Sequence, residues 1–82
     1  MVNKRKSLPL KKIFGTNVRL ERVRQGITQE ELAHRLGQEQ GYVSQIESAK
    51  IVASLDVVDR VAEALGVTYT ALLDETLGRR EG

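Results

Sequence analysis

Apolar residues recur every three to four positions along most of the chain, the spacing that gives an α-helix one apolar face. No run alternates between apolar and polar residues for long enough to predict a strand. Three glycines follow stretches with this helical spacing, as glycines at the C-terminal ends of helices do: Gly26, Gly37 and Gly66. The pattern therefore predicts short helices that end at glycines.

Polar residues mark where several of these helices begin. Thr28, followed three residues later by Glu31, predicts a capping box, in which each side chain binds a free backbone N–H of the other residue. Ser54 and Thr68 can each cap a later helix in the same way as Thr28. The predicted helices are five: residues 10–25, residues 28–37, residues 40–48, one from Ser54 to about residue 65, and a short one after Thr68.

The apolar positions of these helices predict the core of a compact all-α domain over residues 10–77. A basic, flexible arm is expected at residues 1–9 and a frayed tail at 78–82. The inward positions of the first four helices are Ile13, Phe14 and Val18, then Leu32, Ala33 and Leu36, then Val43 and Ile46, and finally Leu55, Val58, Ala62 and Leu65.

Composition narrows the class of protein. A chain of 82 residues has room for one domain, at about 150 residues per domain. It contains no cysteine, which excludes a disulfide-stapled scaffold, a thiolate zinc site and a cysteine nucleophile. Its apolar runs are far shorter than the ~20 residues that span a bilayer. We therefore expect a soluble cytoplasmic protein without a membrane partner.

The charges are unevenly distributed although the net charge is only +2. Residues 1–24 hold eight of the 13 bases and one of the 11 acids. A basic N-terminal segment followed by an acidic remainder of the chain favours a polyanionic partner, either nucleic acid or an anionic membrane surface. A solubilising tail explains the same asymmetry equally well. A membrane-surface peptide would need an amphipathic basic helix, which the sequence does not contain, so nucleic acid and a solubilising tail are the alternatives left open.

The second and third predicted helices are joined by a turn of three residues, Gly37 to Glu39. Such a turn is too short for the two helices to pack antiparallel, so they must cross steeply. This is the helix-turn-helix arrangement.

The residues around this turn resemble the phage-repressor (Cro-like) helix-turn-helix family, with a slight leaning toward restriction–modification controller proteins. The resemblance rests on Arg19 and Arg22, on Gly26-Ile27-Thr28-Gln29-Glu30-Glu31-Leu32-Ala33, on Leu36-Gly37, on Tyr42-Val43-Ser44-Gln45-Ile46-Glu47, and on Leu65-Gly66-Val67-Thr68 with Leu72-Leu73. It implies a lambda-repressor-like fold and a sequence-specific transcriptional regulator that binds a palindromic operator as a homodimer. It implies no cofactor, and no small-molecule ligand is evident.

The resemblance also assigns roles to residues of the third helix. The positions that correspond to base-reading residues are Gln40, Gly41, Ser44 and Gln45. Glutamine can bind adenine N6 and N7 together in the major groove, and serine can bind any base. The alternative is that these are ordinary polar residues on a helix surface.

Other residues correspond to positions that hold DNA phosphates, namely Arg22, Thr28, Gln29, Tyr42, Ser48 and Lys50. Tyr42 has an equal alternative, which is to pack across the turn near Gln38. Arg22 and Glu47 also match a pair that forms a buried salt bridge in the family. The loop after the third helix departs from the family pattern, because Ser48-Ala49 replaces the usual glycine and basic residue.

The fifth helix has more apolar side chains than one internal face can bury. We therefore expect the dimer interface at Tyr69, Leu72, Leu73 and Leu77. A protein-interaction module of the antitoxin type, which keeps the fold without the DNA-binding role, is the competing interpretation. The only histidine, His34, has no nucleophile or metal-ligand partner near it in the sequence, and we expect no enzymatic activity.

Overall fold

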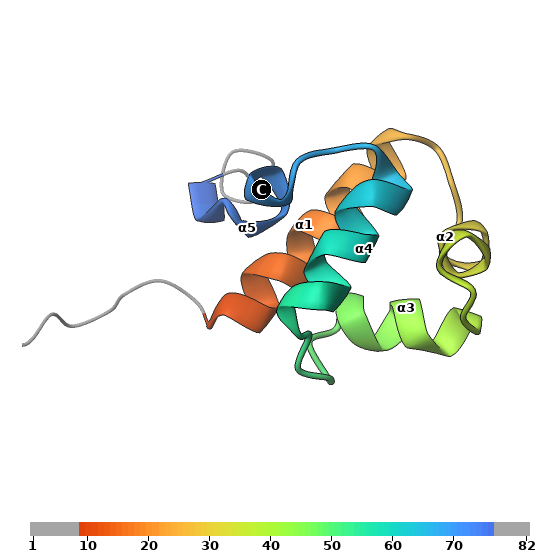
Figure 1. Ribbon diagram of the computed structural model, residues 1–82, viewed down its shortest axis with the longest axis horizontal. Coiled ribbons are helices and arrows are strands. Elements are labelled where there is room, and N and C mark those ends of the chain that lie inside the picture. Colours follow the sequence, from red (N-terminus) through yellow and green to blue (C-terminus); the bar gives the residue numbers. More distant parts are fainter. Residues whose placement is uncertain (1–8, 77–82) are drawn as a thin grey trace, which may run out of the picture.

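The computed structural model describes residues 9–76, which form the predicted all-α arrangement (Figure 1). No strand occurs among these residues, and none of their helices is long and apolar enough to cross a membrane. The helices are α1 (Leu10–Arg24), α2 (Gln29–Leu36), α3 (Gln40–Glu47), α4 (Leu55–Leu65) and α5 (Tyr69–Leu73). The predicted arm and tail lie outside the described residues, except for Pro9, which precedes α1.

The predicted N-terminal caps of three helices are present. Thr28 Oγ1 accepts a hydrogen bond from the backbone N–H of Glu31 at 3.0 Å. Ser54 and Thr68 cap α4 and α5 in the same way, at 3.2 and 3.4 Å. The capping box is only half formed, however, because the Glu31 carboxylate pairs with Arg35 Nε at 3.3 Å.

Helices α2 and α4 end at the glycines that the sequence predicted, whereas α3 ends without a glycine. Gly37 and Gly66 adopt the left-handed conformation with φ of 68° and 70°, which glycine reaches without steric cost. At the end of α3 the residue in this conformation is Ala49, with φ of 61°. The Lys50 N–H donates to the Gln45 carbonyl across it at 2.9 Å, as in a Schellman end.

Most of the predicted inward positions form the core, and α4 requires a correction. Leu55 was expected inside but is 84% exposed, whereas Val61 is completely buried. Val61 lies three residues after Val58 and four before Leu65, so it shares their face of the helix. Leu55 is the first residue of α4, and its side chain stays on the surface of the domain.

Helix α5 packs against α1, and this contact corrects part of the predicted dimer interface. Leu72 is 1% exposed and belongs to the core of its own domain, so its assignment to the interface was wrong. The buried Asn17 of α1 holds the end of α5, because its Nδ2 donates to the Leu72 and Asp74 carbonyls at 3.0 and 2.9 Å. Leu77 lies outside the described residues.

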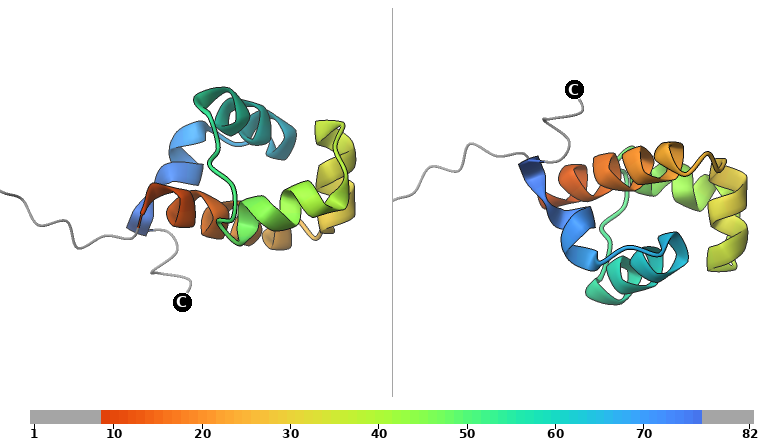
Figure 2. Two further views of the ribbon diagram at one scale, coloured as in Figure 1. Left: turned by 90° about the horizontal axis from the view of Figure 1, so that it is seen from below. Right: turned by 90° about the horizontal axis from the view of Figure 1, so that it is seen from above.

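The crossing of α2 and α3 is visible in Figure 1, where α2 is seen nearly end-on and α3 lies across the view. Figure 2 shows α3 beside α1, with α2 at the far end of the domain from α5. Helix α3 packs against both α1 and α2 and presents its remaining side outward. This arrangement puts the outward side of α3 on the surface of the domain.

Candidate nucleic-acid interface

The outward face of α3 consists of short or uncharged polar residues. Val43 and Ile46 turn inward and are buried. The four predicted base-reading residues are all exposed: Gln40, Gly41, Ser44 and Gln45. Amide and hydroxyl groups can both donate and accept hydrogen bonds, so this face can match the donor and acceptor groups on base edges.

The C-terminal end of α3 is tied to α1 by Arg22 and Glu47. Arg22 Nε lies 2.7 Å from Glu47 Oε2, and Nη2 donates to Oε1 at 3.2 Å. The side chains are only 12% and 4% exposed. Arg22 Nη1 also donates to the Ile27 carbonyl at 2.9 Å, just before α2. One guanidinium therefore joins α1, the start of the helix-turn-helix and α3.

Gly15 allows α3 to approach the backbone of α1 closely. A Cβ added at Gly15 would overlap the Ile46 carbonyl oxygen and lie 3.0 Å from that of Glu47. Both atoms belong to the backbone and cannot move without moving the helix. Sequence reasoning missed this residue, although a glycine in the middle of an amphipathic helix signals close packing.

Two glutamines extend the ion pair to the start of α3. Gln29 Nε2 donates to Glu47 Oε1 at 3.0 Å, and Gln40 Nε2 donates to Gln29 Oε1 at 3.2 Å. Arg22, Glu47, Gln29 and Gln40 thus form one hydrogen-bond chain. Sequence reasoning assigned Gln29 and Gln40 to separate roles and did not predict that their side chains meet across the turn.

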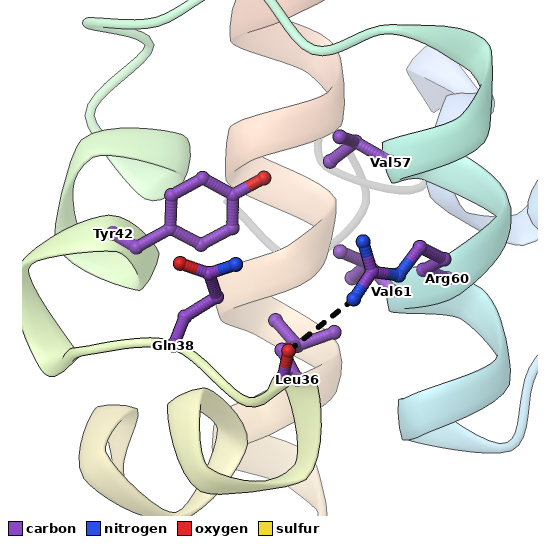
Figure 3. A pocket seen from close by; sticks show the side chains of 6 residues that line it. All are labelled: Leu36, Gln38, Tyr42, Val57, Arg60 and Val61. Carbon is purple, nitrogen blue, oxygen red and sulfur yellow. Dashed lines mark hydrogen bonds between the residues drawn. The ribbon is translucent and has the colours of Figure 1, made fainter.

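Tyr42 occupies the second of the two positions considered for it. Its ring is half-buried against the core and lines a small cavity with Gln38 (Figure 3). In this view the hydroxyl points across the gap toward α4, where Arg60 donates to the Leu36 carbonyl at 3.4 Å. The cavity holds about 10 Å³ of free space, which is roughly the least that one water requires.

The other predicted phosphate contacts lie at the two ends of the helix-turn-helix. Thr28 is exposed at the start of α2 while its hydroxyl caps the helix. Ser48 and Lys50 are exposed after α3, and the Ser48 hydroxyl donates to the Ser44 carbonyl at 2.8 Å. These positions flank the exposed face of α3 on both sides.

Asn17 is a second structural residue that sequence reasoning missed. It lies four residues after Ile13 and therefore on the apolar face of α1, where it is 1% exposed. A polar residue on an inward face was the available signal, because a buried amide requires hydrogen-bond partners.

Two helices that cross at a three-residue turn, the second with an exposed polar face, define a helix-turn-helix protein. The profile of the helix-turn-helix family HTH_3 matches residues 18–72, and the chain belongs to this family.

A curated relative described as a hypothetical transcription factor of Neisseria meningitidis is 39% identical over 64 residues. The match covers 78% of this chain and 60% of that relative's length. The crystal structure of a hypothetical transcription factor from Neisseria has a TM-score of 0.80 and 31% identity, with 98% of this chain and 95% of the other covered.

The restriction-modification controller protein C.AhdI from Aeromonas hydrophila is also similar. Its crystal structure has a TM-score of 0.71 and 31% identity, and the match covers 76% of this chain and 94% of that protein. The resemblance drawn from the sequence is therefore confirmed at the level of the family and the fold.

Proposed function

We propose that this protein is a sequence-specific DNA-binding transcriptional regulator that places α3 in the major groove. The observation that carries the proposal is the exposed polar face of α3, held in place by the buried Arg22–Glu47 pair. A recognition helix must keep its position to within a fraction of an ångström if it is to distinguish bases, and a bidentate ion pair restricts its movement.

Base reading is assigned to the four exposed residues of α3, Gln40, Gly41, Ser44 and Gln45. Phosphate contacts are assigned to Thr28 and Gln29 at the start of α2 and to Ser48 and Lys50 after α3. Arg22 remains a candidate for the same role. The α2 N-terminus adds backbone N–H groups that favour an anion.

We further propose that the protein binds a palindromic operator as a homodimer. One helix in the major groove contacts only a few base pairs, and a two-fold dimer doubles the number of contacts. Two-fold symmetry in the protein then requires two-fold symmetry in the DNA site.

The proposed dimer surface consists of apolar side chains at one end of the domain. We call it the apolar face, and its residues are Leu10, Val52, Leu55, Tyr69 and Leu73. Val52 and Leu55 are 83% and 84% exposed. Two neighbouring cavities of about 140 and 310 Å³ share Leu55, Val58 and Leu73 in their walls, so the surface is continuous. An exposed patch of this kind is typical of an interaction site.

A second copy of the chain fits this face better than an unrelated partner. Lys11 lines one of the two cavities and Asp59 the other. In a two-fold contact the same patch meets itself reversed, so each lysine can face the other copy's aspartate. Val52 lies in the loop that follows α3, so a second copy bound here stands beside the end of that helix.

Selection of bound sequences from random DNA tests the function. We expect an enriched palindrome with two half-sites, about one helical turn apart from centre to centre. We also expect affinity for it to fall steeply as salt rises, because each phosphate contact releases counterions. No enriched sequence from repeated selections at low salt would contradict the proposal.

The dimer is tested by Leu55→Asp, with Val23→Asp as the matched control. Val23 is also a large exposed apolar residue, 57% exposed, but it lies outside the apolar face. Sedimentation at micromolar concentration should show a dimer for the unchanged protein and for Val23→Asp, and a monomer for Leu55→Asp. Equal behaviour of the two variants would exclude this surface.

A protein-interaction module is the second candidate, and one observation favours it. Helix α3 contains no basic residue, and the exposed Glu39 precedes its first turn, where it would face DNA phosphates. A module of this kind would bind DNA weakly and without sequence preference. The selection and the salt dependence above therefore distinguish the two candidates.

A further inference from the structure

A third cavity, of about 390 Å³, lies between α4 and α5 beside the apolar face. We call it the acidic groove, and it is lined by Asp59, Ala62, Glu63, Val67, Thr68 and Tyr69. Asp59 and Tyr69 also line the larger cavity of the apolar face, so the two surfaces adjoin. The lining of the acidic groove combines two carboxylates, an exposed aromatic ring and apolar side chains.

The carboxylates of the acidic groove have no basic partner among residues 9–76. Neither Asp59 nor Glu63 belongs to an ion pair within this part of the chain. The one base of α4, Arg60, donates to the Leu36 carbonyl at the end of α2 instead. Asp59 and Glu63 are four residues apart on one helix, where two like charges repel each other. A basic partner would remove this repulsion.

The chain itself contains a basic segment for which the proposed function gives no role. Lys4, Arg5 and Lys6 lie outside the described residues, three to five positions before Pro9. An extended chain covers 3.3–3.6 Å per residue, so these side chains can reach about 10–18 Å from Pro9. Two residues after Pro9, Lys11 lines a cavity of the apolar face. The basic segment therefore starts beside the proposed dimer surface.

The two-fold contact described above relates this segment to the acidic groove of the other copy. When each Lys11 faces the other copy's Asp59, Pro9 also lies near the other copy's α4. We propose that the segment from Lys4 to Lys6 of each copy binds the acidic groove of the other, so that the two copies exchange basic arms. This inference rests on the proposed homodimer, and it gives the segment a role in assembly rather than on DNA.

The lining of the acidic groove suits lysine and arginine in three ways. The carboxylates of Asp59 and Glu63 attract the charged ends of both residue types. The ring of Tyr69 is 58% exposed, and an ammonium or guanidinium group is attracted to the face of such a ring. Ala62 and Val67 can pack against the aliphatic stems of the same side chains. A DNA phosphate, in contrast, would be repelled by the two carboxylates.

The first test reverses the charge of the segment. The variant carries Lys4→Glu, Arg5→Glu and Lys6→Glu together, and sedimentation at low salt without DNA measures its dimer dissociation constant. Because both arms are changed in each dimer, we expect dimerisation to weaken by about tenfold. The unchanged protein should also dimerise more weakly as salt rises, and the variant should lose most of this salt dependence.

The second test restores the opposite charges at the acidic groove. Asp59→Lys and Glu63→Lys alone should weaken the dimer, and adding them to the charge-reversed segment should bring dimerisation back to within about threefold of the unchanged protein. The matched control adds Glu30→Lys and Glu39→Lys to the same segment. These acids are exposed outside α4 and α5, so the control restores the same net charge and should not rescue the dimer. Circular dichroism checks that each variant keeps its helices.

The outcomes separate the inference from the proposed dimer. If charge reversal leaves dimerisation unchanged and lowers only the salt dependence of operator binding, the segment contacts DNA and the inference is overturned while the dimer stands. A stronger dimer after charge reversal overturns it too, because each arm would then cover its own copy. Equal rescue by the control would reduce the effect to net charge and reject the groove. If the unchanged protein is monomeric both free and on DNA, the proposed dimer fails and the inference with it.

Discussion

The two ends of α3 differ in how the rest of the domain holds them. At the C-terminal end, Glu47 is almost completely buried in its pair with Arg22, and Gly15 brings the α1 backbone against the helix. At the N-terminal end, Glu39 makes no side-chain cap, and Gln40 and Gly41 are exposed. Within residues 9–76, the side chain of Gln40 is held by a hydrogen bond to Gln29 of α2 at 3.2 Å.

The C-terminal end of α3 therefore serves the stability of the domain, and its N-terminal end serves the recognition of DNA. Substitutions at the anchored end that leave a buried charge without its partner should therefore lower the stability of the domain more than they alter its choice of DNA. Substitutions at the open end leave the core intact and should alter DNA binding alone. Each of the following predictions tests one side of that division.

The largest effect is expected for Glu47→Ala at the anchored end. The variant leaves the Arg22 guanidinium buried without its partner, which should lower the free energy of unfolding by about 3 kcal/mol. Urea unfolding measures this change. A loss below about 0.5 kcal/mol would mean that the pair behaves like an exposed surface ion pair.

The next largest effect on folding is expected for Gly15→Ala. The added methyl group overlaps the Ile46 carbonyl oxygen, so α3 must move away from α1. We expect a loss of about 2 kcal/mol in the free energy of unfolding, as is typical of overpacking. A gain in stability, as alanine usually brings to a helix, would show that α3 moves freely.

At the open end, Gln40→Ala should change binding but not folding. We expect a loss of about 1–3 kcal/mol in binding free energy on the selected operator, with relaxed preference at one symmetric base pair. Selection profiles of the variant and the unchanged protein measure both effects. If operator and random DNA lost affinity equally, the reading role would pass to Ser44 and Gln45.

The smallest effect, and one of opposite sign, is expected for Gly41→Ala. Apart from its chain neighbours and the backbone of its own helix, no atom lies within 4 Å of the added Cβ, and alanine is favoured over glycine inside a helix by roughly 0.5–1 kcal/mol. The melting temperature should therefore rise, while operator affinity falls because the methyl group stands on the base-contacting face. A lower melting temperature would mean that Gly41, like Gly15, packs closely against its surroundings and leaves no room for a methyl group.

The sequence predicted the helices well because their start and stop signals act over a few residues. A serine or threonine cap reaches a backbone N–H three positions away, as Thr28, Ser54 and Thr68 do. A glycine ends a helix by its own backbone conformation, as Gly37 and Gly66 do. None of these events depends on where the other helices lie.

The contacts that join distant segments were decided only in the tertiary structure. Asn17 reaches a carbonyl 55 residues away, and Gln40 meets Gln29 only because a turn brings α3 back across α2. Leu55 and Leu72 look alike in the sequence, yet one is exposed and the other buried. Helical spacing determines which residues share a face. Which face another helix covers depends on the packing of the whole domain, and that packing decides which apolar and polar side chains are left for a partner.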